Sequence, residues 1–248
     1  MVSLTDVQAA SVRIAPHVRR TPLMHAAALK NAPNGSTLWL KLEHMQVSGS
    51  FKARGAVNKL LSTPTETLQR GVITASGGNH GLAVAYTGWL AKVPVYVYLP
   101  HNTPPSKAEK LRVWGAEVVM HGAVWDDANA AAQARAEQDG LTYVHPFADP
   151  LVIAAQGSIA LEVLEDLPQV DTLLVAIGGG GLISGVSLAA KALKPSVRVI
   201  GIEPVGAPTL KESLAANAVV SLPVISTRAN MRRSTLRSSA KMWMTSCW

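Results

Sequence analysis

The chain has 248 residues, of which 48% are hydrophobic and 16% charged, so it can bury a large core in one domain or two smaller ones. Aromatic residues make up only 5%, and a core built mainly from Ala, Val, Leu and Ile is typical of α/β proteins with buried parallel strands. The longest apolar runs, such as residues 93–99, are too short to cross a bilayer, and the first residues lack the features of a secretory signal. The single cysteine, Cys247, cannot form an internal disulfide. We therefore expect a cytoplasmic protein without a membrane segment.

The net charge of +7 is concentrated at one end of the chain. Five of the 23 basic residues lie in residues 228–248, which contain no acidic residue, so the first 227 residues carry 18 basic against 16 acidic residues. They hold no basic stripe with interleaved aromatics, and we expect no nucleic-acid partner. Residues 228–248 form an atypical basic tail, which is either a disordered extension or the product of a lost reading frame.

Strand and helix signals alternate in chain order after an amphipathic N-terminal helix, for which Thr5 and Asp6 are capping candidates. The expected strands cover residues 36–43, 71–76, 93–100, 117–122, 142–147, 171–181 and 197–204. The expected helices between them cover residues 51–61, 81–91, 105–115, 126–140, 151–167 and 181–193. This alternation predicts parallel sheets with crossover helices, hence an α/β fold.

The stretch SGSFKARG, residues 48–55, places Lys52 in a turn flanked by small residues, with an aromatic residue beside it. A surface lysine would not need such neighbours, so the pattern raises the question of what Lys52 does. The alternative is an ordinary helix start, with Ser48 or Ser50 as the N-cap of an amphipathic helix.

The stretch SGGNHG, residues 76–81, lies between an expected strand and an expected helix. Backbone N–H groups at a helix N-terminus are unpaired, and small residues let an anion reach them. The candidate carboxylate- or phosphate-binding residues are Ser76, Gly77, Gly78, Asn79 and His80. The alternative is a plain turn, with Asn79 at positive φ and His80 merely exposed.

The stretch GGGGLISG, residues 178–185, is a third strand-to-helix junction, and its uncovered backbone suits a phosphate at a helix N-terminus. The alternative is a close packing turn. A dinucleotide site is a second alternative, because Glu203 lies where a ribose-binding acid would fall, but the G-x-G-x-x-G pattern fails in both registers. No metal-binding spacing or nucleophile elbow occurs. The scattered histidines are expected on the surface or in packing: His44, His101, His121 and His145.

Taken in order, SGSFKARGA, SGGNHG and GGGGL make the chain resemble the serine/threonine dehydratase (threonine ammonia-lyase) family, over residues 5–227. These are pyridoxal 5'-phosphate (PLP) enzymes of fold type II, similar to the tryptophan synthase β chain. The resemblance implies that Lys52 forms the Schiff base with PLP, that Phe51 packs near the ring and that Asn79 bonds the ring hydroxyl. It also implies that the backbone of Ser76–His80 binds the substrate carboxylate. The implied phosphate-binding residues are Gly178, Gly179, Gly180, Gly181 and Leu182.

The resemblance implies α,β-elimination on L-threonine or L-serine, giving 2-oxobutanoate or pyruvate and ammonia, as in isoleucine biosynthesis, by a homo-oligomer. Racemases of the family carry a second serine directly after the position of Ser76, where this chain has Gly77, so we favour a dehydratase over a serine racemase; a hydroxy-aspartate ammonia-lyase is a further alternative. The family's cation site matches at Glu203 and Ala207 but not at Thr209, so we expect no metal.

The implied architecture is two lobes, each an open, mostly parallel sheet with helices on both faces, and PLP in the cleft between them. We expect a large lobe formed by residues 1–70 plus 149–227, a small lobe formed by 71–148, and the tail at 228–248. The family's catalytic domain runs on beyond residue 248 and supplies the group that faces the pyridine nitrogen. The chain is therefore expected to be C-terminally truncated or frameshifted, and a non-catalytic fragment stays an alternative.

Overall fold

A computed structural model describes residues 2–27, 35–218, 220 and 243–246. Its helices are α1 (Leu4–Ile14), η1 (a 3-10 turn, Glu43–Met45), α2 (Lys52–Leu61), α3 (Thr65–Leu68), α4 (Asn79–Ala91), α5 (Pro105–Val113), α6 (Trp125–Asp139), α7 (Pro150–Asp166), α8 (Gly181–Leu193) and α9 (Thr209–Ala216). Its strands are β1 (Leu23–His25), β2 (Trp39–Lys41), β3 (Val72–Ala75), β4 (Val95–Leu99), β5 (Glu117–Met120), β6 (Thr142–Tyr143), β7 (Thr172–Ala176), β8 (Arg198–Glu203) and β9 (Trp243–Ser246).

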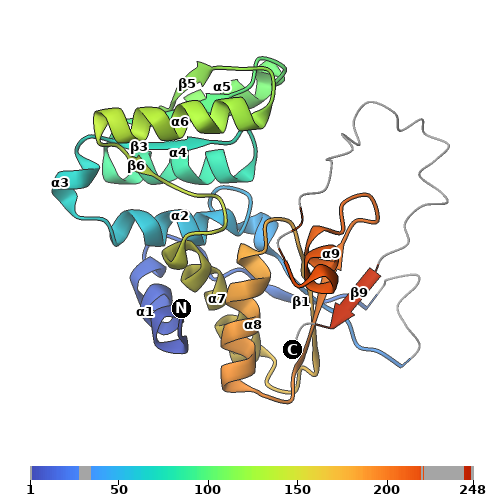
Figure 1. Cartoon of the computed structure of the whole chain (residues 1–248). Coiled ribbons are helices and arrows are strands. Elements are labelled where there is room, and N and C mark those ends of the chain that lie inside the picture. The colour runs from blue at the N-terminus through green and yellow to red at the C-terminus, as the bar shows by residue number, and fades with distance from the viewer. Residues whose placement is uncertain (1, 28–34, 219, 221–242, 247–248) are drawn as a thin grey trace.

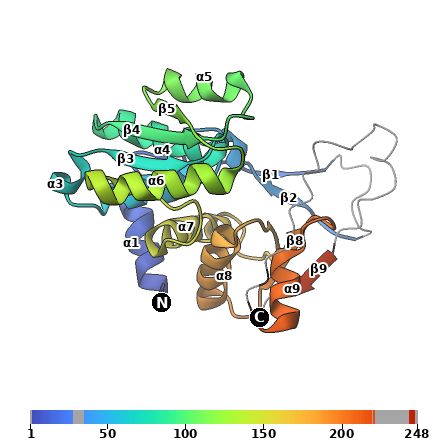
Figure 2. The same cartoon turned by 45° about the horizontal axis from the view of Figure 1, so that its top comes forward.

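One sheet has the strand order β5-β4-β3-β6, and all of its neighbouring strands are parallel. Successive side chains of β3 face opposite sides, so Val72 packs into a core shared with α4 and α5, while Ile73 and Ala75 pack against α6. Figure 2 shows α6 in front of this sheet and α4 behind it. The apolar strands expected from the sequence are therefore covered by helices on both faces.

The second main sheet has the order β7-β8-β9, in which β7 and β8 are parallel and β9 is antiparallel to β8. Helices α7 and α8 pack together nearby, and their backbones meet at Gly157 and Gly185: a Cβ on Gly185 would lie 2.7 Å from the nitrogen of Gly157. A further pair, β1 and β2, forms a separate antiparallel ladder. Figure 1 shows α2 between the β3–β6 sheet with its helices and the group formed by α1, α7 and α8.

Most expected elements are present, with shifted ends. The strand expected over 36–43 is reduced to β2, because residues 43–45 turn into η1, and β1 was not predicted at all. The strand expected over 142–147 keeps only two residues, and the strand over 171–181 ends at Ala176. Of the predicted tail, residues 243–246 form β9, and the rest lies outside the described residues. The α/β class with mostly parallel sheets is confirmed.

Candidate active site around Lys52

Lys52 is the first residue of α2, and its ammonium group points toward a loop far along the chain. The Nζ atom donates a hydrogen bond to the carbonyl oxygen of Pro146 at 2.5 Å and lies 5.2 Å from the centre of the Phe51 ring. Burial lowers the pKa of the Lys52 amine from 10.5 to about 8, because the charged form loses water. A lysine with this pKa is partly neutral near neutral pH, which a nucleophile or a general base requires.

The SGGNHG turn connects the end of β3 to the start of α4 at Asn79. Ser76 and Gly77 are half-buried, whereas Gly78 and Asn79 are exposed, so their backbone is open to a ligand. Gly81 is required by packing, because a Cβ there would lie 1.9 Å from the carbonyl oxygen of Ser76. The turn therefore combines an open helix N-terminus with a tightly packed second half.

His80 is not exposed, contrary to the plain-turn alternative, and its Nε2 is not free to bind a ligand. Its ring is 4% exposed, and Nε2 donates to the carbonyl oxygen of Val144 at 2.9 Å. Burial lowers the pKa of His80 to about 3, so the ring is neutral. His80 thus fixes the start of α4 against the strand-end segment at residue 144.

The four glycines lie between the end of β7 and the start of α8, and they divide into two pairs. A Cβ on Gly179 would lie 2.3 Å from the Phe147 ring, and one on Gly181 would lie 2.7 Å from the Phe147 carbonyl oxygen. At Gly178 and Gly180, by contrast, no described atom lies within 4 Å of the Cβ position. Gly180 has a φ of +83°, which favours glycine. One pair serves packing, and the other leaves the backbone open.

Residues 144–148 bring the three turns together. No motif in the sequence predicts this role for them. Val144 accepts from His80, Pro146 accepts from Lys52, and Phe147 packs on Gly179 and Gly181. His145, which we expected on the surface or in packing, holds this loop, because its Nδ1 accepts the backbone N–H groups of Phe147 (3.2 Å) and Ala148 (2.9 Å).

Burial lowers the pKa of His145, and the neighbouring positive charge of Lys52 acts in the same direction. The ring is therefore neutral near neutral pH and can keep accepting these two N–H groups through Nδ1. The other three scattered histidines are exposed, as expected: His44, His101 and His121.

Glu203 is buried at the end of β8 and caps a helix. The residue is 4% exposed, and its carboxylate accepts the backbone N–H groups of Leu210 (2.8 Å) and Lys211 (3.0 Å) at the start of α9. Both oxygens are thus used in capping a helix. In the part of the chain that the structure describes, no group of three or more His, Cys, Asp or Glu side chains could hold a metal ion.

The residues around Lys52 fit pyridoxal phosphate. A Schiff base needs a lysine that loses its proton easily, which burial of Lys52 provides. A phosphate needs uncovered N–H groups at a helix N-terminus, which the open backbone of Gly178 and Gly180 before α8 provides.

Comparisons with known proteins point to the same cofactor. Residues 14–244 match the family model described as pyridoxal-phosphate dependent enzyme. The chain is 46% identical to an L-threonine ammonia-lyase of Geobacter sulfurreducens and 42% identical to one of Thermotoga maritima, covering 93% and 86% of this chain. It spans only 57% and 53% of these two relatives.

Among solved structures, maize serine racemase superposes with a TM-score of 0.86 at 38% identity, over 90% of this chain and 67% of that one. In the described residues, no helix is long and apolar enough to span a membrane. The sequence resemblance to PLP enzymes of fold type II is confirmed, and the chain belongs to the pyridoxal-phosphate dependent enzyme family.

Proposed function

We propose that the protein is a PLP-dependent ammonia-lyase that converts L-threonine, and L-serine in the same way, into 2-oxobutanoate or pyruvate and ammonia. The observation that carries the proposal is the convergence of three turns on residues 144–147, which brings Lys52 and the glycine loop to adjacent residues. The two threonine ammonia-lyases that are 46% and 42% identical support the choice of substrate.

Lys52 is proposed as the residue that carries the cofactor and then takes the Cα proton of the substrate. PLP, when bound, supplies the electron sink that makes this proton acidic. Burial lowers the pKa of the amine to about 8, so the neutral form needed for both roles is available near neutral pH. The Pro146 carbonyl oxygen accepts from Nζ and orients the amine.

The remaining residues are proposed to hold the two anionic groups on either side of Lys52. The backbone of Gly178–Gly181 with Leu182 would bind the cofactor phosphate at the start of α8, and Phe51 would pack near the cofactor ring. The backbone of Ser76–His80 would bind the substrate carboxylate, with the Asn79 side chain on the ring hydroxyl. His80, fixed to Val144, keeps this turn in place rather than contacting the reacting atoms.

Serine racemase is a second candidate, because maize serine racemase superposes with a TM-score of 0.86. Gly77 argues for the lyase, since it lacks the hydroxyl that the resemblance assigns to racemases at this position.

We also propose that the chain forms two lobes, a large one from residues 1–70 plus 149–227 and a small one from residues 71–148. We propose further that the protein is a cytoplasmic homo-oligomer that acts in isoleucine biosynthesis.

A turnover assay tests the proposed activity. The purified chain with PLP is given L-threonine, L-serine or 3-hydroxy-L-aspartate, and 2-oxo acid, ammonia and D-amino acid are measured. The proposal expects 2-oxobutanoate and ammonia in equal amounts from L-threonine, and none from Lys52→Ala. Accumulation of D-serine without 2-oxo acid would favour the racemase, and no turnover by folded protein carrying PLP would contradict both.

A further inference from the structure

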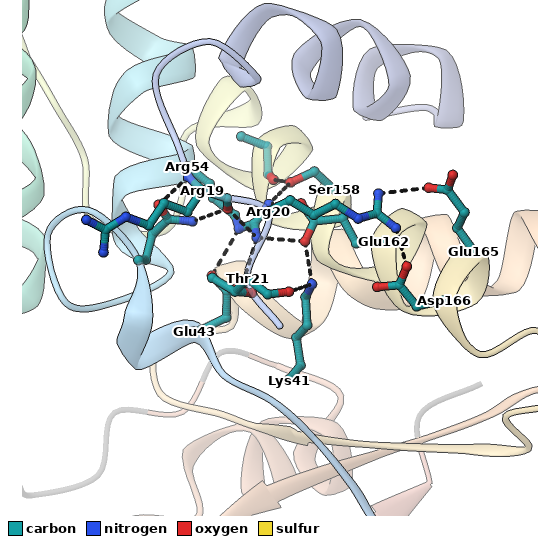
Figure 3. Close-up of polar contacts among 12 residues, drawn as sticks. Arg19, Arg20, Thr21, Lys41, Glu43, Arg54, Ser158, Glu162, Glu165 and Asp166 are labelled. Carbon is teal, nitrogen blue, oxygen red and sulfur yellow. Dashed lines mark hydrogen bonds and ion pairs between the residues drawn. The ribbon is translucent and has the colours of Figure 1, made fainter. Parts of the chain in front are cut away.

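A buried group of charged side chains lies on the side of α2 away from the candidate active site. We call it the Arg54 cluster: Lys41 from β2, Glu43 from η1, Arg54 from α2 and Glu162 from α7. Arg54 is 0% exposed and is the largest of the fully buried side chains in the described structure. Figure 3 shows Glu43 and Glu162 directed toward its guanidinium group, and Lys41 directed toward Glu162 and Thr21. No sequence motif points to a role for these residues.

The two carboxylates hold the guanidinium from two sides. Nε and Nη2 of Arg54 donate to the two oxygens of Glu43 at 3.0 and 2.8 Å, and Nη1 and Nη2 donate to those of Glu162 at 2.5 and 3.0 Å. Nη1 also donates to Ser158 Oγ at 3.1 Å. Paired hydrogen bonds of this kind fix direction as well as distance, which a lysine ammonium cannot do.

The cluster is balanced in charge and tied to the backbone. Lys41 Nζ lies 2.5 Å from a Glu162 oxygen and donates to the Thr21 carbonyl oxygen, while the Thr21 hydroxyl donates to Glu43. Two positive and two negative groups therefore compensate each other away from water. Burial alone would lower the pKa of Arg54, but the hydrogen bonds to Glu43 and Glu162 outweigh it and raise that pKa, so the cation is kept.

The first turn of α2 needs the support of the Arg54 cluster, because the capping of this helix is weak. The N-cap residue, Phe51, offers no side-chain cap, and Ser50 Oγ accepts only a long hydrogen bond, of 3.4 Å, from the backbone N–H of Lys52. Helix ends without such support open easily. Lys52 and Arg54 are two positions apart, so their side chains leave the helix in nearly opposite directions. Fixing Arg54 on one side therefore fixes Lys52 on the other.

The Arg54 cluster also links Lys52 to its hydrogen-bond acceptor, the Pro146 carbonyl oxygen. Ser158 and Glu162 belong to α7, which starts at Pro150, four residues after Pro146. Gly55 packs directly on the same helix, since a Cβ there would lie 2.7 Å from Val152 Cγ1. The cluster thus joins the helix that carries the Lys52 amine to the helix that follows the accepting carbonyl.

We propose that Arg54 is a positioning residue for Lys52, with Glu43 and Glu162 as the groups that orient it, so that the Arg54 cluster holds the amine at the Pro146 carbonyl. This inference rests on the proposed function for its catalytic meaning, but its structural content concerns only this chain. Arg54 touches no reacting atom, and it acts through the first turn of α2.

The test compares two arginine-to-lysine substitutions in protein without cofactor. Arg54→Lys keeps the charge and removes the paired hydrogen bonds. The matched control is Arg20→Lys, because Arg20 also contacts two carboxylates, those of Glu165 and Asp166, but its side chain is 48% exposed. Acetylation of Lys52 is followed against pH by mass spectrometry, and circular dichroism checks that each variant is folded.

We expect the wild-type and Arg20→Lys proteins to label at Lys52 with a midpoint near pH 8. In Arg54→Lys the loosened turn exposes the amine, and the midpoint rises by about one pH unit or more, since less burial means less loss of the charged form. His80 and His145, the titratable groups whose pKa values Lys52 lowers, are neutral at these pH values and do not produce this change.

A folded Arg54→Lys protein whose Lys52 midpoint equals or falls below that of wild type would overturn the inference. If Arg54→Lys does not fold, Glu43→Gln takes its place, because this substitution removes one of the two carboxylates that hold Arg54 and keeps the other. The midpoint of Lys52 labelling must then rise in Glu43→Gln, and an unchanged midpoint overturns the inference. Failure of the proposed function is separate: wild-type protein would then show the low midpoint at Lys52 but no turnover.

Discussion

The division of the four glycines into a packing pair and an open pair gives a prediction with a magnitude. Gly181→Ala would place a Cβ 2.7 Å from the oxygen and 3.0 Å from the Cα of Phe147, and neither backbone atom can rotate away. Overpacking costs about 1–3 kcal/mol in general, and contact with two backbone atoms places this case at about 2–3 kcal/mol, of which the better helix propensity of alanine offsets about 1 kcal/mol. We therefore expect Gly181→Ala to lower the free energy of unfolding by about 1–2 kcal/mol.

Gly178→Ala is the matched substitution in the same loop. No described atom lies within 4 Å of the new Cβ, and the φ of Gly178 is not in the left-handed region, so the free energy of unfolding should change by less than about 1 kcal/mol. The new methyl group would, however, cover backbone that we propose contacts the cofactor phosphate. We expect at least a roughly tenfold weaker affinity for PLP, equivalent to about 1.4 kcal/mol.

Urea and thermal unfolding of the cofactor-free proteins measure the first quantity, and titration with PLP followed by absorbance measures the second. For a chain of this size, 1–2 kcal/mol corresponds to a fall in melting temperature of roughly 2–8 °C. A Gly181→Ala protein as stable as wild type would refute the packing argument. A Gly178→Ala protein that binds PLP as tightly as wild type would refute the assignment of the open pair to the phosphate.

Three further predictions follow from buried polar groups. His80 has a pKa of about 3 in the folded protein and an ordinary pKa near 6.5, so between these pH values the unfolded chain binds more protons than the folded one. The free energy of unfolding should therefore fall on acidification below pH 6.5, by up to about 1.4 kcal/mol per pH unit. The slope should be shallower in His80→Gln. Because Glu203 caps α9, Mg²⁺ or a chelator should leave the melting temperature unchanged while Glu203→Gln loses about 1 kcal/mol of stability; a rise of several degrees with Mg²⁺ would contradict this. Glu162→Gln leaves the two buried cations Lys41 and Arg54 with one carboxylate, and it should lower the free energy of unfolding in urea by about 3–5 kcal/mol. Adding Lys41→Met should recover part of that loss. A double variant no more stable than the single one would show that charge balance is not the cause.

The sequence alone was enough to predict the α/β class and the position of Lys52 at the start of a helix, because both depend on local patterns. The alternation of apolar strands and amphipathic helices is readable residue by residue, and so are glycines at strand-to-helix junctions. The predicted ends were less accurate: the strand over 171–181 stops at Ala176, since the glycines after it form a loop rather than continuing the ladder.

The parts that could not be predicted involve residues far apart in the chain. Nothing in the local sequence around residue 146 shows that its carbonyl oxygen accepts a hydrogen bond from Lys52, 94 positions earlier. Nor does it show that packing of Phe147 requires glycine at position 179. Arg54 and Glu162 are separated by 108 positions, and each alone looks like an ordinary surface charge on a helix. His145 was interpreted as a surface or packing residue for the same reason, since its role depends on a loop held beside a distant lysine.

The most direct test is to treat the purified chain with PLP, reduce it with borohydride and identify the modified peptide by mass spectrometry. We expect one reduced PLP group, located on Lys52 and absent from Lys52→Ala. Folded protein that acquires no such group, or that acquires it equally on another lysine, would contradict the central claim that Lys52 and the glycine loop form a cofactor site in this chain.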